Sequence, residues 1–315
     1  MKLISVVVPV YNEESNIHEV YRRCSAVLAL MGPYELIFVN DGSIDRTLDA
    51  LKEIAAKDQR VKIVSFARNF GHQMAVTAGL DHACGDAAVI IDGDLQDPPE
   101  LIPQMLGKWQ EGYQVVYAKR KRRKGDSIFK RATAFLFYRV LRALTSTEIP
   151  LDTGDFRLLD RSVINVLKGM RERSRFIRGL IAWVGFRQIG VEFERHERFS
   201  GDTKYPLSKM IKFALNGIIS FSDKPLKIAS FMGLVCSCVG MTMILWGIYS
   251  KFFRPESTLP GWTSVFIAVL FLGGIQLFTI GIIGEYIGRI YEESKSRPLY
   301  VVSELINYEP QSHDR

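Results

Sequence analysis

Two long uncharged segments constrain this chain more than any other feature of its sequence. Ile228 to Tyr249 and Trp262 to Gly284 contain 22 and 23 residues without an Asp, Glu, Lys or Arg. At 1.5 Å per residue, helices of these lengths are about 33 to 35 Å long, which is enough to cross the hydrocarbon core of a bilayer. Soluble helices rarely continue beyond about 20 residues without a charge, so buried core helices are the weaker interpretation. The sequence predicts two transmembrane helices joined by a short loop.

Basic residues flank both segments and predict their orientation. Eight precede the first segment and three follow the second: Arg187, Arg195, Arg198, Lys204, Lys209, Lys212, Lys224 and Lys227, then Arg289, Lys295 and Arg297. By the positive-inside rule we expect both termini of this multi-pass protein to lie in the cytoplasm, although Lys251 and Arg254 in the loop reduce the asymmetry. Tyr205 to Lys227 mixes apolar residues with lysines, which predicts amphipathic helices in the membrane interface.

The first part of the chain alternates short apolar runs with amphipathic stretches. The strand-like runs are Leu3 to Val8, Leu36 to Val39, Val61 to Phe66, Ala87 to Ile91 and Val115 to Ala118. The helix-like segments between them are Ser15 to Leu30, Thr47 to Ala56, Gln73 to His82 and Pro99 to Gly112. Such alternation predicts an α/β domain with a mostly parallel sheet. Ligands of these sheets bind at the carboxyl ends of the strands, so the residues there are the candidates for function.

Carboxylates gather after the fourth predicted strand. Asp92, Asp94 and Asp97 directly follow an apolar run, and alternate residues of an extended segment point the same way. Asp92, Asp94 and Gln96 can therefore present oxygens to one point, which suits Mg²⁺ or Mn²⁺ with phosphates completing the coordination shell. Asp97 precedes two prolines and is expected to cap the next helix. No dinucleotide-binding G-x-G-x-x-G follows the first strand and no P-loop occurs, which argues against dehydrogenases and P-loop NTPases.

These strand-end residues resemble the family 2 glycosyltransferases of the GT-A fold. The resemblance is carried by Val8-Pro9-Val10-Tyr11-Asn12-Glu13-Glu14, Asn40-Asp41-Gly42-Ser43, Arg68-Asn69-Phe70-Gly71 and Asp92-Gly93-Asp94-Leu95-Gln96-Asp97-Pro98-Pro99. The stretch from Gly154 to Arg161 and the two apolar segments resemble the polyprenyl-phosphate branch, most closely the bactoprenol glucosyltransferases of O-antigen modification, with dolichol-phosphate mannosyltransferases as more distant relatives.

The resemblance implies a domain plan and a set of site residues. It implies a Rossmann-like GT-A domain over 1–204, interfacial helices over 205–227, a two-helix transmembrane domain over 228–288 and a cytoplasmic tail over 289–315. Nucleotide binding is implied for Pro9, Tyr11, Glu13, Asp41, Arg68 and Asp92, and metal binding for Asp92, Asp94 and Gln96. Gly93 departs from the family, in which alanine is more common, and we expect it to loosen the loop without removing a ligand.

Asp155 is our candidate for the acidic residue at the reacting centre, together with Asp94. The acceptor would be a phosphate monoester with a second pKa of about 6, already largely dianionic at neutral pH, so no strong base is needed. We therefore expect Asp155 to orient the acceptor or to take up a residual proton. Asp152 and Asp160 are close alternatives, although Asp160 also suits a helix cap. His72 and His82 have no carboxylate at ligand spacing in the sequence and are interpreted as structural.

Six basic residues follow the fifth predicted strand, from Lys119 to Lys124. Alone this run suits nucleic acid, but beside two apolar segments it indicates anionic lipid headgroups or a lipid phosphate, and we expect no nucleic-acid partner. The net charge of +7 agrees with anionic partners. Candidate phosphate-binding residues are Lys119, Arg120, Arg131, Arg198 and Lys204, for which a solvated basic surface is the alternative.

Taken together, the residues and the resemblance predict a membrane-anchored, metal-dependent enzyme. It would move a single hexose, with inversion, from a nucleotide sugar to polyprenyl (undecaprenyl) phosphate, and UDP-glucose is the expected donor. Mannose or an amino sugar is the alternative cargo, and a catalytically idle nucleotide-sugar-binding scaffold is the alternative class. Relatives form homo-oligomers, so a homo-oligomer is expected here, in which Leu299 to Ile306 would add an exchanged strand between protomers.

Overall fold

The computed structural model describes residues 2–120, 153–173, 175–193, 224–253 and 261–308 of the 315-residue chain. These residues form two compact units, an α/β domain and a helical hairpin. The α/β domain contains the described residues up to 193 together with 297–308, and the hairpin contains those from 224 to 296. The last part of the segment expected to be a separate tail therefore belongs to the α/β domain.

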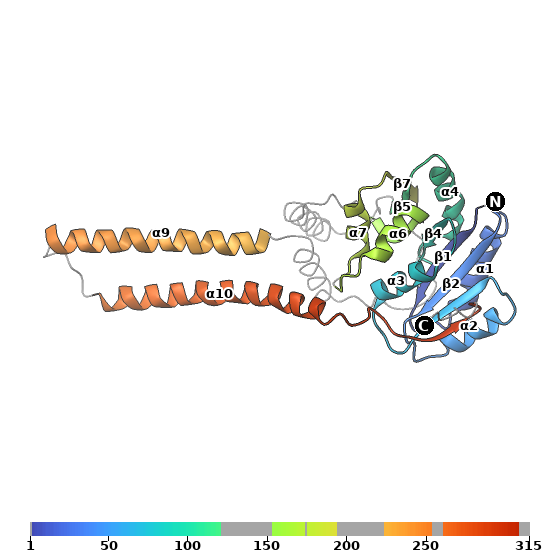
Figure 1. Ribbon diagram of the computed structural model, residues 1–315, viewed down its shortest axis with the longest axis horizontal. Coiled ribbons are helices and arrows are strands. Elements are labelled where there is room, and N and C mark those ends of the chain that lie inside the picture. The colour runs from blue at the N-terminus through green and yellow to red at the C-terminus, as the bar shows by residue number, and fades with distance from the viewer. Residues whose placement is uncertain (1, 121–152, 174, 194–223, 254–260, 309–315) are drawn as a thin grey trace, which may run out of the picture. The chain divides into compact units, whose positions relative to one another are not determined.

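One mixed sheet forms the centre of the α/β domain (Figure 1). Its strand order in the described residues is β7-β5-β6-β4-β1-β2-β3-β8. The strands are β1 (Ile4–Val10), β2 (Tyr34–Asn40), β3 (Val61–Phe66), β4 (Ala87–Ile90), β5 (Val115–Arg120), β6 (Thr153–Asp160), β7 (Gln188–Phe193) and β8 (Val302–Ile306). The pairs β1–β2, β1–β4, β2–β3 and β5–β7 are parallel, whereas β6 is antiparallel to β4 and β5 and β8 is antiparallel to β3.

The prediction of a mostly parallel sheet is correct for four of the seven strand pairs in the described residues, and the three pairs that β6 and β8 make are antiparallel. All five predicted strands are present, but β6 is inserted between β4 and β5. Phe156, Leu158 and Leu159 are fully buried there, and their burial fixes the strand in place. An antiparallel insertion needs no crossover helix, so strand-helix alternation in the sequence gives no sign of it.

The helices follow the predicted segments closely. They are α1 (Ile17–Leu28), α2 (Thr47–Ala55), α3 (His72–His82) and α4 (Ile102–Gln110), which follows the short 3₁₀ helix η1 (Pro99–Leu101), and then α6 (Arg161–Gly169) and α7 (Ile177–Val184). The central strands are buried on both faces, which explains their almost uninterrupted apolar sequences. On one face, α3 approaches so closely that a Cβ added at Gly79 would lie 2.1 Å from Val7 Cγ1.

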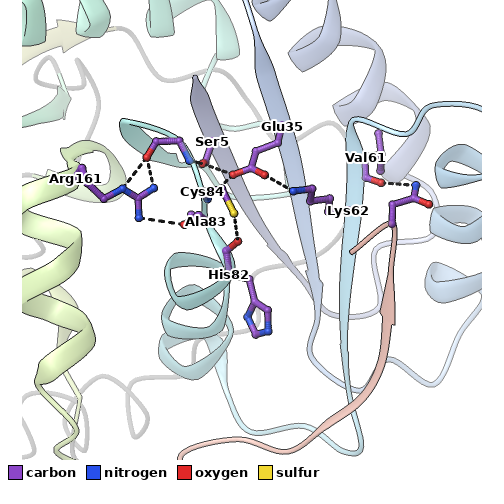
Figure 2. A network of polar contacts seen from close by, with 10 residues as sticks. Ser5, Glu35, Val61, Lys62, His82, Ala83, Cys84 and Arg161 are labelled. Carbon is purple, nitrogen blue, oxygen red and sulfur yellow. Dashed lines mark hydrogen bonds and ion pairs between the residues drawn. The ribbon is translucent and has the colours of Figure 1, made fainter. Parts of the chain in front are cut away.

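A polar network holds the amino ends of the strands, the edge opposite to the strand ends considered above (Figure 2). Buried Glu35 accepts hydrogen bonds from Ser5 Oγ at 2.5 Å, from Cys84 N at 2.6 Å and from Lys62 Nζ at 2.7 Å. The guanidinium of Arg161 donates to the carbonyl oxygen of Ala83 at 3.0 Å and to that of Gly85. This network links β1, β2, β3 and the segment before β4, and it does not involve the carboxyl ends of the strands, where the candidate functional residues lie.

The hairpin consists of α9 (Lys224–Phe253) and α10 (Trp262–Ser294), which run side by side (Figure 1). Large apolar side chains such as Phe231, Leu234 and Leu277 are more than 60% exposed on these helices, as expected for surfaces that lipid covers. Within the described residues, Phe271–Ser294 is long and apolar enough to cross a membrane, and the apolar segment of α9, Ala229–Met243, is shorter. The whole of the second predicted segment, Trp262 to Gly284, lies within α10. Of the expected interfacial helices, 205–223 lie outside the described residues.

The strand expected between Leu299 and Ile306 is present as β8. It pairs antiparallel with β3, and Ile63 lies opposite Ile306. In this single chain its partner is β3 of the same chain, so exchange between protomers stays a prediction. The edge of the sheet beside β3 is covered in this way by residues that follow the hairpin.

Candidate active site

The loops that follow β1 and β2 are joined to each other by polar contacts at the carboxyl edge of the sheet. Asn12, with a left-handed φ of 54°, donates from its backbone N to Ser43 Oγ at 3.0 Å and accepts from Ile44 N at 2.9 Å. Glu13 N donates to Thr47 Oγ1 at 2.9 Å. Among the residues predicted to bind the nucleoside, Pro9 is buried, Glu13 is half-buried and Tyr11 is 38% exposed, so Tyr11 offers a ring surface at this edge.

Asp41 fixes the loop that follows β3. Its carboxylate accepts hydrogen bonds from Phe70 N at 2.7 Å and from Gly71 N at 2.9 Å, and burial raises its pKa. Gly42 has a φ of 65°, and a Cβ added there would lie 2.4 Å from the carbonyl carbon of Arg68. The loops after β2 and β3 therefore pack backbone to backbone, which requires glycine. Asp41 is predicted to contact the nucleoside, and its hydrogen bonds from Phe70 N and Gly71 N show that it also holds the loop after β3.

The side chain of Arg68 lies at the same edge. Its guanidinium is 4.2 Å from the ring centroid of Phe70, and its Nη1 donates to the carbonyl oxygen of Asn69 at 3.2 Å. The residue is exposed, so its charge remains accessible to an anionic ligand.

The predicted metal ligands follow β4. Among the described residues, Asp92 Oδ1 is buried and has no hydrogen-bond partner, whereas Asp94 Oδ1 accepts from Gln96 N at 3.1 Å. Leu95, which lies between Asp94 and Gln96, has a left-handed φ of 58°. This conformation is strained for a leucine, and such strain clusters at functional sites. Burial and the charges of Asp155 and Asp94 raise the pKa of Asp92, although His72 opposes them.

This donor set fits a divalent cation whose coordination a phosphate ligand completes. Asp92 Oδ1 has no hydrogen-bond partner among the residues that the structure describes, and burial with the neighbouring carboxylates raises the pKa of Asp92 even though His72 lowers it, so a cation bound beside Asp92 would be stabilised there. In the described part of the chain, no three His, Cys, Asp or Glu side chains gather into a complete metal site. Mg²⁺ sites commonly have few carboxylates and take further ligands from substrate phosphates, so the two observations agree.

Asp155 on β6 lies beside Asp92 and between two cations. The β4–β6 register places Ile90 opposite Arg157, and its continuation brings Asp155 towards Asp92. Asp155 Oδ1 accepts from Arg178 Nε at 2.6 Å, and Asp155 Oδ2 lies 3.2 Å from His72 Nε2. The same His72 nitrogen lies 3.7 Å from Asp92 Oδ1.

The two cations change the acid–base properties of this cluster. Burial alone would raise the pKa of Asp155, but the hydrogen bond from His72 and the charge of Arg178 hold it far below its usual range. Burial alone would lower the pKa of His72, but Asp155 and Asp92 raise it to about 9. At neutral pH Asp155 is therefore ionised and paired with two cations, and it is a poor proton acceptor.

The premise of the structural interpretation of His72 is wrong, because the fold supplies the two carboxylates that its sequence neighbourhood lacks. His82 agrees with a structural role, since its Nδ1 bonds the carbonyl oxygen of Ala78 at 2.8 Å. Arg178, at the start of α7, belongs to no motif considered above and was also missed. The only advance signal for His72 was its position directly after the Arg68-Asn69-Phe70-Gly71 motif.

The alternatives to Asp155 have other places. Asp160 caps α6 by accepting from Ser162 N at 2.9 Å, as expected, and it also accepts from Trp109 Nε1 at 2.8 Å. Asp152 lies outside the described residues. Asp97 is buried one residue before Pro98, which directly precedes the 3₁₀ helix η1, so its expected cap stays a prediction.

The predicted phosphate-binding residues are only partly visible. Lys119 is exposed at the end of β5, and its Nζ lies 3.7 Å from Glu192 Oε1 on β7. The backbone of Arg120 ends β5. Arg131, Arg198 and Lys204 lie outside the described residues, so their phosphate binding stays a prediction.

Comparison with known proteins supports an enzyme assignment for this edge of the sheet. Residues 5–167 match the model of glycosyl transferase family 2, and residues 224–290 match that of the GtrB C-terminal hairpin. This chain belongs to glycosyl transferase family 2. It is a glycosyltransferase related to the bactoprenol glucosyl transferases, and its C-terminal hairpin anchors it to a membrane.

The relatives match over nearly their whole length. A glycosyltransferase of Bacillus subtilis (strain 168), named as the uncharacterized YkcC, is 53% identical over 306 residues, covering 97% of this chain and 94% of the relative. The bactoprenol glucosyl transferase of Shigella phage SfV is 43% identical over 303 residues, covering 95% and 97%. A solved structure, the glucosyl-3-phosphoglycerate synthase of Mycobacterium tuberculosis with phosphoglyceric acid, is 22% identical with a TM-score of 0.47, covering 70% of this chain and 80% of that one.

Proposed function

We propose that this glycosyltransferase transfers a single glucose, with inversion, from UDP-glucose to polyprenyl (undecaprenyl) phosphate at the cytoplasmic face of the inner membrane. The observation that carries the proposal is the carboxylate and cation cluster of Asp92, Asp155, His72 and Arg178 at the carboxyl edge of the sheet. Relatives named bactoprenol glucosyl transferase, 43% identical over 95% of this chain, support glucose and a polyprenyl carrier.

The donor would bind along the ends of β1, β2 and β4. The nucleoside would contact Pro9 at the end of β1 together with Tyr11, Glu13, Asp41 and Arg68, which lie on the loops that the Asn12 and Asp41 contacts join together. Asp92, Asp94 and Gln96 would hold Mg²⁺ or Mn²⁺ with the diphosphate. The ion, when bound, offsets the negative charge that develops on the leaving diphosphate.

The acceptor phosphate would need no proton removed. Its second pKa is about 6, so it is largely a dianion at neutral pH and is already nucleophilic. A carboxylate whose pKa is held far below the usual range is correspondingly unsuited to act as a base. We infer that Asp155 instead fixes His72 and Arg178, so that two positive charges stand in defined positions where anionic substrates meet.

The membrane would hold the acceptor. The α9–α10 hairpin would anchor the chain as a multi-pass protein with both termini in the cytoplasm. Lys119, Arg120, Arg131, Arg198 and Lys204 would contact the lipid phosphate and the anionic headgroups around it. Homo-oligomers are expected, as are products that serve O-antigen modification.

A transfer assay with purified full-length protein in detergent tests the proposal. Radiolabelled UDP-glucose, GDP-mannose and UDP-N-acetylglucosamine are each incubated with polyprenyl phosphate, with Mg²⁺, with Mn²⁺ or with chelator. We expect label in the lipid from UDP-glucose, loss of this label with chelator, and loss in Asp94→Asn. Transfer from another donor would show that its sugar, and not glucose, is the one transferred. Tight UDP binding without transfer from any donor would favour a catalytically idle scaffold.

A further inference from the structure

The segment that follows the hairpin returns to the α/β domain and contacts the helix that carries His72. Tyr300 Oη donates to Asp81 Oδ2 at 2.8 Å, and Asp81 is the penultimate residue of α3. The side chain of Asp81 is only 11% exposed and also accepts from Arg171 Nη1 at 2.7 Å. One end of α3 is therefore tied to Tyr300, while the other end places His72 against Asp155 and Asp92.

The ring of Tyr300 contacts a second part of the site. It stacks on Phe66 with centroids 5.1 Å apart and an interplanar angle of 17°, and Phe66 meets Phe70 edge to face at 5.6 Å. Phe70 is the residue whose backbone N donates to Asp41. Beside this stack, Ala67 N donates to the carbonyl oxygen of Val301 at 3.0 Å. The ring thus packs against the base of the loop that Asp41 holds.

Other contacts fix the same segment at positions away from Tyr300. Ser303 Oγ donates to the carbonyl oxygen of Ser65 at 3.0 Å, and Lys52 Nζ pairs with Glu304 Oε2 at 2.7 Å. Asn307 Nδ2 donates to the carbonyl oxygens of Ala55 and Val61. Because β8 is held by these contacts and by its pairing with β3, it can stay in place when Tyr300 is changed.

We propose that Tyr300 is a positioning residue for glycosyl transfer, whose hydroxyl fixes α3 and His72 and whose ring fixes the 68–71 loop against Asp41. The inference deepens the proposed function and rests on it for its kinetic test. Since the hydroxyl and the ring lead to different parts of the site, their removal has different consequences. Loss of the hydroxyl disturbs the cluster at the reacting centre, and loss of the ring also disturbs the donor loop.

Two variants and a control separate these effects. Tyr300→Phe keeps the ring, Tyr300→Leu removes both contacts, and Ser303→Ala removes a hydrogen bond that the same segment makes to β3 rather than to α3. We expect Tyr300→Phe to lower kcat about tenfold with the donor KM within about twofold, because small misplacements at a reacting centre are costly. Tyr300→Leu should lower kcat similarly and raise the donor KM about fivefold, and Ser303→Ala should leave both values within about twofold.

Hydrogen exchange gives a readout that does not depend on the donor. In Tyr300→Leu, the amides of α3 and of Phe70 and Gly71 should exchange faster than in the wild type and in Ser303→Ala, since these groups lose support. If both Tyr300 variants only melt at lower temperature, with kcat, KM and this exchange unchanged, Tyr300 is merely structural and the inference is overturned. Wild-type protein inactive with every donor would refute the proposed function, and the exchange comparison would still decide the role of Tyr300.

Discussion

Replacing Asp155 with asparagine tests whether this residue anchors cations or accepts a proton. The substitution preserves the shape of the side chain and removes its charge. Asp160→Asn is the matched control, because Asp160 is a carboxylate of the same strand that caps α6 and lies outside the cluster. An anchor and a base both predict loss of transfer, so the pH dependence of the remaining activity decides between them.

The structure sets the expected size of the effect. Removing one partner of a fully buried ion pair costs about 3 to 5 kcal/mol. Here the side chains are 13% exposed for Asp155, 27% for Arg178 and 38% for His72, so solvent screens part of the lost attraction. We expect the unfolding free energy to fall by about 2 kcal/mol and kcat to fall about 100-fold, because both cations lose their fixed positions.

The assay is lipid transfer at saturating donor between about pH 5.5 and 8.5, a range that spans the acceptor's second pKa. If Asp155 is an anchor, wild type and variant both show a rate that rises up to about pH 6 and is level above it. If Asp155 is a base, the wild type keeps its rate below about pH 6 by taking the acceptor's remaining proton, whereas the variant, which depends on the dianion already present in solution, loses rate there. A wild-type rate that stays level below about pH 6, or a variant within about threefold of wild-type kcat, would refute the anchor.

Three further substitutions test other parts of the fold. Burial alone would raise the pKa of Glu35, but the hydrogen bonds from Lys62 and Ser5 lower it. The stability that ionised Glu35 contributes is therefore present above pH about 4.5 and is lost as the pH falls through the lower pKa of the folded state. Glu35→Gln should lower the free energy of unfolding by about 2 kcal/mol at pH 7, and thermal melts should show a smaller difference from the wild type at pH about 4. Gly42→Ala should weaken UDP binding at least about tenfold by calorimetry, because its Cβ cannot fit against Arg68. Gly93→Ala places a Cβ 2.9 Å from Cγ1 of buried Val10, so the loop itself must move to accept it. If the loop is loose, transfer should stay within about threefold, and loss of activity would show that the loop is tighter.

The sequence was sufficient to predict the residues that stand directly after parallel strands. Asp92 and Asp94 follow β4, and Asp41 follows β2, so the rule that strand ends share an edge was enough to group them. Asp155 could be proposed only through a resemblance, because its strand β6 is antiparallel and enters the sheet without a crossover helix. Its alternative Asp160 was distinguished by the cap of α6, which local sequence did indicate.

Contacts between distant segments could not be predicted in this way. His72 lies 83 positions before Asp155, and Arg178 comes from a helix that no motif announced. The hydrogen bond between Tyr300 and Asp81 joins residues 219 positions apart, across the whole hairpin sequence. In each case the residues next to the side chain in the sequence give no sign of a partner, and only the folded domain brings the partner into contact.

The charges of the cluster also explain why loss of Asp155 should spare nucleotide binding. In the wild type, His72 and Arg178 are already paired with Asp155, and Asp92 and Asp94 lie beside this group, so the carboxylates disfavour a diphosphate unless a divalent cation is bound. Asp155→Asn removes one negative charge and releases two cations from their partner. Nucleotide affinity then has no electrostatic reason to fall, even though kcat does. We therefore expect Asp155→Asn to lower kcat without weakening nucleotide binding, because Asp155 acts by positioning the charges at the reacting centre.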